Sequence, residues 1–318
     1  MSIKINTEEY EIIKQLGKGG FGEVYLVSNK KDNKKYAVKK IVINNLAEDK
    51  IKGIENEAII LSSISSEHIV KYYDSFMDSH CFYILMEYCE NDLKKFINEH
   101  KGKNEFLDEN IIYNIVLEIC LGIKEIHKHN LIHRDLKPEN IFINKDNKIK
   151  IGDFGISKQL NINQKYAFSA IGTNYYMAPE IIKGEKYNNK IDIWALGCII
   201  YELFTFNICF ESESLLGLVN AILEKNHGKI DLKKYNLKWQ NLIDLLLKKD
   251  YKERPNIDEV YNYVNNILKK EVISKIDINY YKKLKKISDE ELKYLNAQGV
   301  KFYYIQSKIL FFYNFLSK

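Results

Sequence analysis

The stretch LIHRDLKPENIFI, residues 131 to 143, places polar and charged residues between two apolar ends. The ends, residues 131–132 and 141–143, have the character of strand or core positions. The side chains between them are costly to bury unless each is paired. They are His133, Arg134, Asp135, Lys137, Glu139 and Asn140. Since packing does not explain them, the stretch predicts a polar site held between two apolar anchors.

Several of these side chains have the chemistry of a phosphoryl-transfer centre. Asp135 can accept the proton of a substrate hydroxyl group, and Lys137 can neutralise negative charge on a phosphoryl group in transfer. Asn140, five residues after Asp135, can coordinate a metal ion, and Asp153, in IGDFG thirteen residues later, supplies a second oxygen ligand. Such a site suits Mg²⁺, which needs few protein ligands besides phosphate oxygens and water.

A glycine-rich segment, LGKGGFGEV at 16 to 24, precedes this centre. Glycine lets backbone amides come close to a phosphate group because no Cβ is in the way. The segment alone fits a plain turn equally well, and a dinucleotide-binding fold would need a helix after it. A strand-like run, EVYLVS, follows instead. The residues expected along a nucleotide here are Leu16, Gly17, Lys18, Gly19, Gly20, Phe21, Gly22, Glu23 and Val24.

Lys39 stands in the middle of the apolar strand YAVKK. A lysine at such a position is most often a solvent-facing strand residue. Its alternative role is to hold the α- and β-phosphates of a nucleotide, for which it needs a carboxylate from the following helix. Glu57 in ENEAIILSS is the expected partner and Glu55 its competitor, because Glu57 is better placed relative to the apolar face.

These motifs occur in one order along the chain, and together they resemble those of eukaryotic protein kinases. The segments GTNYYMAPE (172–180), DIWALG (192–197) and KERP (252–255) complete the family's set. The resemblance implies an α+β, bilobal kinase fold with a small β-rich lobe and a large α-rich lobe. Three β-branched and aromatic runs, YEIIKQLGKG, GEVYLVSN and KKYAVKKIVI, agree with it as predicted strands. The stretch KIKGIENEAIILSSI after them predicts a helix, because its apolar residues recur at spacings of three and four, and helical periodicity dominates from about residue 92.

The resemblance also predicts how the chain is divided. Residues 1–9 would be an N-terminal extension and residues 10–268 the kinase domain, with lobes at about 10–86 and 92–268 and a hinge at 87–91. Residues 269–318 are expected to form a helical tail of unknown role. That tail either covers an apolar patch of the larger lobe or binds a partner.

The family's site residues carry over to matching positions. The resemblance makes Asp135, Lys137, Lys39 and Glu57 catalytic and assigns Asn140 and Asp153 to Mg²⁺, with ATP as the phosphoryl donor. It places Val24 and Ala37 around the adenine ring, Met86 at the gatekeeper position, and the backbones of Glu87 and Cys89 against adenine. It further implies that Glu180 pairs with Arg254, that Asp192 braces the catalytic loop, and that Thr173 positions Asp135 and Lys137. The Cys89 thiol is expected to be inert, because no activating base is evident.

Lys137 and Thr173 place the chain with the serine/threonine class, and the closest resemblance is to the NIMA-related kinases. HIVKYYD (68–74), IGDFGISKQL, SAIGTNYYMAPEI and FESESLLGLVNAI (210–222) support it, while EYCENDL is one residue short of that family's form. By this resemblance Ser169 is the candidate activation-loop phosphosite, paired with Arg134 once phosphorylated. Tyr72 is expected to point into the cleft and hold the enzyme off.

Composition bounds the alternatives. The chain has 318 residues, 46% hydrophobic and 29% charged, as in ordinary globular proteins. The net charge of +5 is small and forms no basic stripe, and no run of about 18 apolar residues is present, which argues against nucleic-acid and membrane partners. Five cysteines without a C-x-x-C pair indicate reduced thiols in an intracellular chain, cytoplasmic by default with the nucleus left open.

Protein substrates are the implied partners, with an upstream kinase or a tail-binding protein as further candidates. The sequence does not indicate an oligomeric state. Two other functions compete with the kinase. One is a nucleotide-binding scaffold with little catalytic activity, against which the intact Asp135 speaks. The other is a kinase of small molecules or lipids, which GTNYYMAPE disfavours because it resembles a peptide-docking loop.

Overall fold

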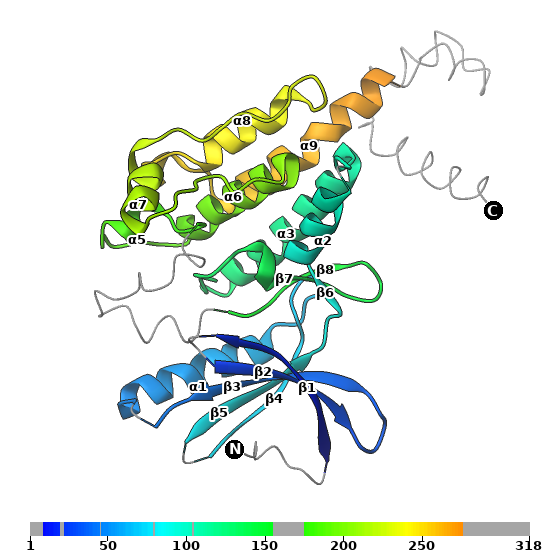
Figure 1. Cartoon of the computed structure of the whole chain (residues 1–318), viewed down its shortest axis with the longest axis vertical. Helices are drawn as coiled ribbons and strands as arrows, with labels where there is room; N and C mark the ends of the chain where they lie inside the picture. The colour runs from blue at the N-terminus through cyan, green and yellow to red at the C-terminus, as the bar shows by residue number, and fades with distance from the viewer. Residues whose placement is uncertain are drawn as a thin grey trace, which may run out of the picture. The chain divides into compact units, whose positions relative to one another are not determined.

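The computed structural model (Figure 1) describes residues 9–19, 22–44, 46–78, 80–103, 105–154 and 175–275. The side chains of residues 49, 50, 57 and 268–275 lie outside this description. Residues 1–265 form one compact unit and residues 266–318 a second one. All the motifs quoted above belong to the first unit.

The first part of the chain folds into a five-stranded antiparallel sheet of order β1-β2-β3-β5-β4. Its strands are β1 (Tyr10–Gly19), β2 (Gly22–Asn29), β3 (Lys35–Val42), β4 (Tyr72–Met77) and β5 (Cys81–Glu87). The three runs predicted as strands form β1, β2 and β3. Val27, Val38 and Tyr83 are almost fully buried in one cluster. Because successive side chains of a strand point to opposite faces, the residues next to these three face the other side of the sheet.

Helix α1 (Glu48–Ser63) lies between β3 and β4 in the chain and confirms the helix predicted there. Ile54, Ala58 and Leu61 follow one another at spacings of four and three, and all three are buried. That spacing makes one apolar stripe along a helix. The stripe packs the helix onto the sheet, where α1 contacts β4.

The second part of the chain is mainly helical. It also contains a small antiparallel sheet of order β6-β7-β8, formed by β6 (Asn91–Asp92), β7 (Ile141–Ile143) and β8 (Ile149–Ile151). The α-helices are α2 (Leu93–Gly102), α3 (Glu109–Lys128), α5 (Pro179–Ile182), α6 (Lys190–Thr205), α7 (Leu215–Glu224), α8 (Leu237–Leu246) and α9 (Ile257–Lys275). Among the described residues there are also two 3-10 turns, η1 (Pro138–Asn140) and η3 (Tyr251–Glu253).

Helix α6 forms the centre of this helical part. Every residue from 191 to 200 is buried, and the sequence is apolar on nearly all sides of the helix. A helix of that kind is stable only when other elements surround it. It packs against α3 and α8 (Figure 1). The charged residues that α6 nevertheless carries must therefore be paired inside the protein.

The β-rich part followed by the α-rich part confirms the predicted α+β, bilobal kinase fold. Strand β5 ends at Glu87 and β6 begins at Asn91, which leaves the connection at the predicted hinge. The lobe boundaries and the role of the tail stay predictions, and residues 276–318 lie outside the described part.

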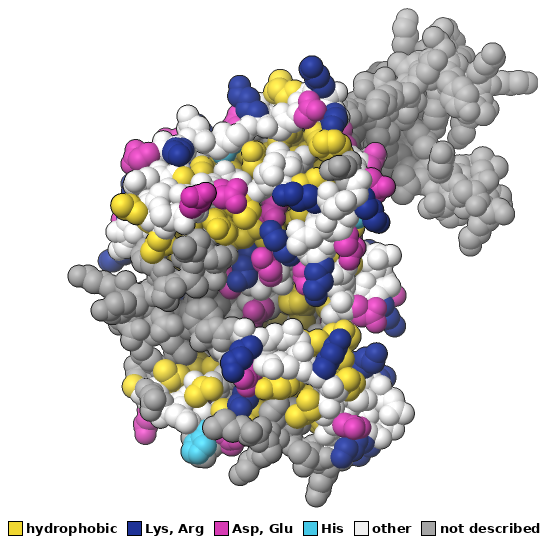
Figure 2. Space-filling model, in the orientation of Figure 1, with side chains coloured by type: hydrophobic (Ala, Val, Ile, Leu, Met, Phe, Trp, Pro, Cys, Tyr) yellow, Lys and Arg dark blue, Asp and Glu magenta, His cyan; other side chains and the backbone are white. Residues whose placement is uncertain are grey.

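The described surface carries charged side chains of both signs. None of the described helices is long and apolar enough to cross a membrane. On the described face in Figure 2, Lys and Arg side chains alternate with Asp and Glu rather than gathering by sign. All five cysteines are free thiols.

Candidate active site

The segment 131–143 is held in place by a buried aspartate of α6. The backbone N–H groups of His133 and Arg134 donate to the two carboxylate oxygens of Asp192, at 2.9 and 3.1 Å. His127 Nε2 lies 2.8 Å from the same carboxylate. Burial alone would raise the pKa of Asp192, but the His127 and His133 contacts hold this pKa below its ordinary value. The prediction that Asp192 braces the catalytic loop is confirmed.

Asp135, Lys137 and Asn140 meet within the loop. Asn140 Nδ2 donates to the backbone carbonyl and to Oδ2 of Asp135, at 2.7 and 3.1 Å. Lys137 Nζ lies 3.2 Å from the same Oδ2. The 3-10 turn η1 brings Asn140 back over Asp135. Both of these hydrogen bonds use the Asn140 nitrogen, so the amide oxygen is the atom that this side chain offers to a metal ion.

Asp153 is fixed by the residue before it. The Gly152 carbonyl lies 3.0 Å from Nε2 of the buried His133. A Cβ at Gly152 would lie 2.6 Å from Val70 Cγ2, so a larger residue would fit at this position only if Val70 moved. Asp153 and Arg134 have φ angles of +55° and +65°, in the left-handed region that residues other than glycine rarely adopt. Strained backbone at two places in one site is typical of residues positioned for function.

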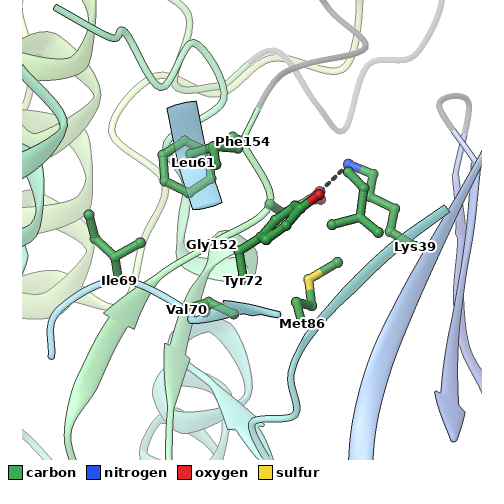
Figure 3. A pocket seen from close by; sticks show the side chains of 10 residues that line it. Lys39, Leu61, Ile69, Val70, Tyr72, Met86, Gly152 and Phe154 are labelled. Carbon is green, nitrogen blue, oxygen red and sulfur yellow. Dashed lines mark hydrogen bonds and ion pairs between the residues drawn. The ribbon is translucent and has the colours of Figure 1, made fainter. Parts of the chain in front are cut away.

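Lys39 reaches Asp153 from the small lobe. Its side chain is only 9% exposed, and its ammonium group forms an ion pair with Asp153 Oδ1 (Figure 3, dashed line). Burial acts to raise the pKa of Asp153, but Lys39 outweighs it and the pKa is lowered. The Gly152 N–H, next to Asp153, donates to the Asn140 carbonyl at 3.0 Å, so the Lys39–Asp153 pair adjoins the loop that carries Asp135 and Lys137.

The partner predicted for Lys39 was Glu57. Glu57 belongs to α1, as expected, but its side chain lies outside the described residues. In the structure the described partner of Lys39 is Asp153. The pairing with Glu57 therefore stays a prediction.

A cavity of about 40 Å³ adjoins this ion pair. Tyr72 and Met86 point into it in Figure 3, and Leu61, Ile69 and Phe154 are among its other lining residues. Tyr72 and Met86 are register partners in β4 and β5. Burial raises the pKa of Tyr72. The tyrosine expected in the cleft is thus found beside the expected gatekeeper residue and the Lys39 ion pair.

The predicted nucleotide contacts lie along the small-lobe strands. Leu16, Gly17 and Lys18 belong to β1, Glu23 and Val24 to β2, and Ala37 to β3. Val24 is the register partner of Lys39, and Ala37 that of Met86. These positions place both apolar residues on the strands that carry the lysine and the gatekeeper residue.

Gly22 begins β2 where the glycine-rich segment turns. Its φ is +139°, and a Cβ there would lie 2.0 Å from the Lys40 carbonyl oxygen. Only glycine fits this backbone conformation and this close approach. Gly19 ends β1, whereas Gly20 and Phe21 lie outside the described residues.

The connection after β5 holds the predicted adenine contacts. The Glu87 N–H donates to the Lys71 carbonyl at 2.8 Å, and the Glu87 carboxylate pairs with Lys150 at 3.0 Å. Burial and the neighbouring Glu87 charge raise the pKa of the Cys89 thiol to about 12. A thiol with that pKa holds little thiolate at neutral pH, which agrees with the inert Cys89 that the sequence predicted.

Arg254 and Glu180 form a buried ion pair in the larger lobe, as the resemblance implied. The Arg254 nitrogens lie 2.7 and 2.8 Å from the two Glu180 oxygens, and each residue is 2% exposed. Arg254 also donates to the carbonyls of Lys190, Lys248 and Lys249. Ser169 and Thr173 lie outside the described residues, so their predicted roles are not placed.

Sequence reasoning missed His127 as a support of the site. It contacts Asp192 from 65 positions away, at the end of α3. It also missed Glu202 and the two side chains that donate to its carboxylate, Lys94 and Tyr176. A charged residue such as Glu202 in the otherwise apolar run WALGCIIYELFTF was the available signal. The sequence gives no sign of which residues would pair with it.

Together the sheet, the helical part and the Lys39–Asp153–Asp135 arrangement define a protein kinase. A family model described as "Protein kinase domain" matches residues 10–264.

Three curated relatives show to which group of protein kinases the chain belongs. The chain is 36% identical over 269 residues to "Serine/threonine-protein kinase Nek1" of Mus musculus, which covers 84% of this chain and 22% of that protein. It is 36% identical over 294 residues to "Probable serine/threonine-protein kinase nek2" of Dictyostelium discoideum, covering 90% of this chain and 69% of that protein. It is 35% identical over 267 residues to "Serine/threonine-protein kinase Nek5" of Homo sapiens, covering 83% and 37%. The chain belongs to the NIMA-related serine/threonine protein kinases, and it spans only part of these relatives.

Proposed function

We propose that this chain is an ATP- and Mg²⁺-dependent protein kinase, which transfers the γ-phosphoryl group of ATP to serine and threonine hydroxyls of proteins. One observation carries the proposal. Five charged or polar side chains gather at one site although they come from separate segments of the chain. They are the ion-paired Lys39 and Asp153, and the loop residues Asp135, Lys137 and Asn140. A nucleotide phosphate and a hydroxyl acceptor need these charges and oxygen ligands within a few ångströms of each other.

Each residue has a role that its position supports. The Asp135 carboxylate accepts the hydroxyl proton, and the Lys137 ammonium beside it offsets charge on the phosphoryl group. Lys39 would hold the α- and β-phosphates in place of its present partner Asp153. Asn140 and Asp153 present oxygen atoms of the kind that Mg²⁺ binds, and the bound ion would neutralise phosphate charge.

The competing function is a scaffold that binds nucleotide without transferring phosphate. Intact mass of the purified chain after incubation with Mg-ATP separates the two. We expect the unaltered chain to gain phosphate and Asp153→Ala to gain none. Asp146→Ala is the matched control, because Asp146 is an exposed aspartate in a turn seven residues away. If the unaltered chain binds Mg-ATP but phosphorylates neither itself nor protein substrates, the scaffold is the better account.

Tyr72→Ala is expected to raise basal activity by about tenfold, because a minor active conformer typically holds up to about 10% of a population. Removing the ring takes away the side chain that lines the cavity beside Lys39 and Asp153. Initial rates of peptide phosphorylation measure the effect. Tyr73→Ala is the control, since Tyr73 is 45% exposed and packs against Tyr36. Equal basal rates in Tyr72→Ala and the unaltered chain would refute the inhibitory role.

Ser169→Ala is expected to lower activity by about tenfold, the loss that one charge-assisted hydrogen bond to a phosphate accounts for. Arg134, placed next to Asp135 by Asp192, is the proposed partner of that phosphate. Kinetics of the phosphorylated chain and of both single and double variants test it. The losses of activity caused by Arg134→Ala and by Ser169→Ala should not add in the double variant, because each change removes the same interaction. Full activity of Ser169→Ala contradicts the assignment.

A further inference from the structure

A buried carboxylate, that of Glu202, lies outside the proposed catalytic group, and each of its two oxygens accepts a hydrogen bond from a side chain in a distant part of the chain. Glu202 of α6 is 1% exposed. Its Oε1 accepts from Lys94 Nζ at 2.7 Å, and its Oε2 accepts from the Tyr176 hydroxyl at 2.5 Å. None of the proposed catalytic steps uses these three residues, which we call the Glu202 cluster.

The Glu202 cluster lies against the loop that carries Asp135. Lys94 belongs to α2, which packs on η1, the turn that contains Glu139. Burial and Glu202 raise the pKa of Tyr176, with a smaller contribution from the exposed Glu139 of η1. Glu139 follows Asp135 by only four positions. A peptide whose hydroxyl group reaches Asp135 can therefore bring a neighbouring side chain to the cluster.

The cluster needs a cation at one defined place. An ionised carboxylate that is buried without a cation is strongly destabilised. Tyr176 supplies one neutral hydrogen bond, so Lys94 supplies the charge. The Lys94 side chain is 25% exposed while that of Glu202 is 2% exposed, so the ammonium group reaches the carboxylate from the surface. A lysine or arginine side chain of another molecule could use the same approach.

We infer that Lys94 fills, from the kinase's own chain, a subsite that would otherwise accept a basic side chain of the protein substrate. The inference rests on the proposed kinase function and adds a specificity determinant to it. With Lys94 in place, the subsite gains nothing from a substrate lysine or arginine. Without it, Glu202 together with Glu139 attracts one.

The test replaces the ammonium group and keeps the stem. The peptides are a series around one threonine in which a single arginine is moved from position to position. At one of these positions, we expect Lys94→Met to bind the peptide at least about tenfold more tightly than the unaltered chain does. The probes are fluorescent peptides that differ only in where the arginine stands, each with a norleucine counterpart. Adding Glu202→Gln to Lys94→Met should abolish the gain.

Lys95→Met is the matched control. Lys95 is the next residue of α2, 66% exposed, and pairs with Asp92 at 2.9 Å. It carries the same charge but does not touch Glu202, so its loss should leave the arginine preference unchanged. Should Lys94→Met fail to fold, as thermal unfolding would reveal, Lys94→Gln removes the same charge and keeps a polar end for Glu202.

Affinity by fluorescence anisotropy requires no phosphoryl transfer, so the two proposals can fail separately. If the folded Lys94 variants show no arginine preference, or if Lys95→Met shows the same preference, the subsite inference is overturned and the cluster is purely structural. If the preference appears but the unaltered chain transfers no phosphate, the inference stands and the proposed catalytic function fails. Peptide phosphorylation by the same variants should shift kcat/KM in the direction of the affinities.

Discussion

Asp135→Asn is expected to lower the rate of phosphoryl transfer by about 10² to 10⁴-fold, the usual contribution of a positioned general base. The amide has nearly the size of the carboxylate, and Asn140 can still donate to the backbone carbonyl of residue 135. What is lost is the group that accepts the hydroxyl proton. The loop itself should persist, because Asp192 holds it through the backbone of residues 133 and 134.

Steady-state kinetics with a threonine peptide measure the loss, and a separate binding assay with Mg-ATP shows whether the nucleotide site survives. We expect kcat to fall and the affinity for Mg-ATP to stay close to that of the unaltered chain. Asp146→Asn is the matched control, since this exposed aspartate is outside the site. Near-normal kcat in Asp135→Asn would mean that another group accepts the proton.

Arg254→Leu is expected to reduce the free energy of unfolding by about 3 to 5 kcal/mol, the typical cost of removing one partner of a buried ion pair. The change leaves the Glu180 carboxylate, 2% exposed, without its two charged donors. It also leaves carbonyls of residues 190, 248 and 249 without the Arg254 hydrogen bonds. The effect should exceed that of any exposed charge.

Denaturant unfolding of a double-mutant cycle distinguishes the stranded charge from lost packing. Glu180→Leu combined with Arg254→Leu should recover part of the stability, because neither charge then remains buried alone. Lys252→Leu is the control, being exposed two residues away. A double variant that loses the sum of the two single losses would show that the ion pair itself is not the source.

The sequence by itself determined the class of fold and most of the candidate chemistry. Strands β1 to β3 and helix α1 form where β-branched runs and a spacing of three and four predicted them, because such patterns depend on neighbours along the chain. Asp135, Lys137 and Asn140 lie within six positions, so their spacing already places them together in one loop, which ends in the turn η1. Glycine positions were likewise readable, and Gly22 proved to need a left-handed backbone.

Only the tertiary structure decided which distant charges meet. Lys39 lies 114 positions from its partner Asp153, and Lys94 lies 108 positions from Glu202. His127 supports Asp192 across 65 positions. Contacts of this kind leave no periodic signal, since they depend on how elements pack rather than on local spacing. The sequence predicted Glu180 with Arg254 and Asp192 with the catalytic loop only through resemblance to a family. Lys94 has no counterpart in the motifs that carried the resemblance, so its partner became visible only when α2, α6 and the loop before α5 were packed together.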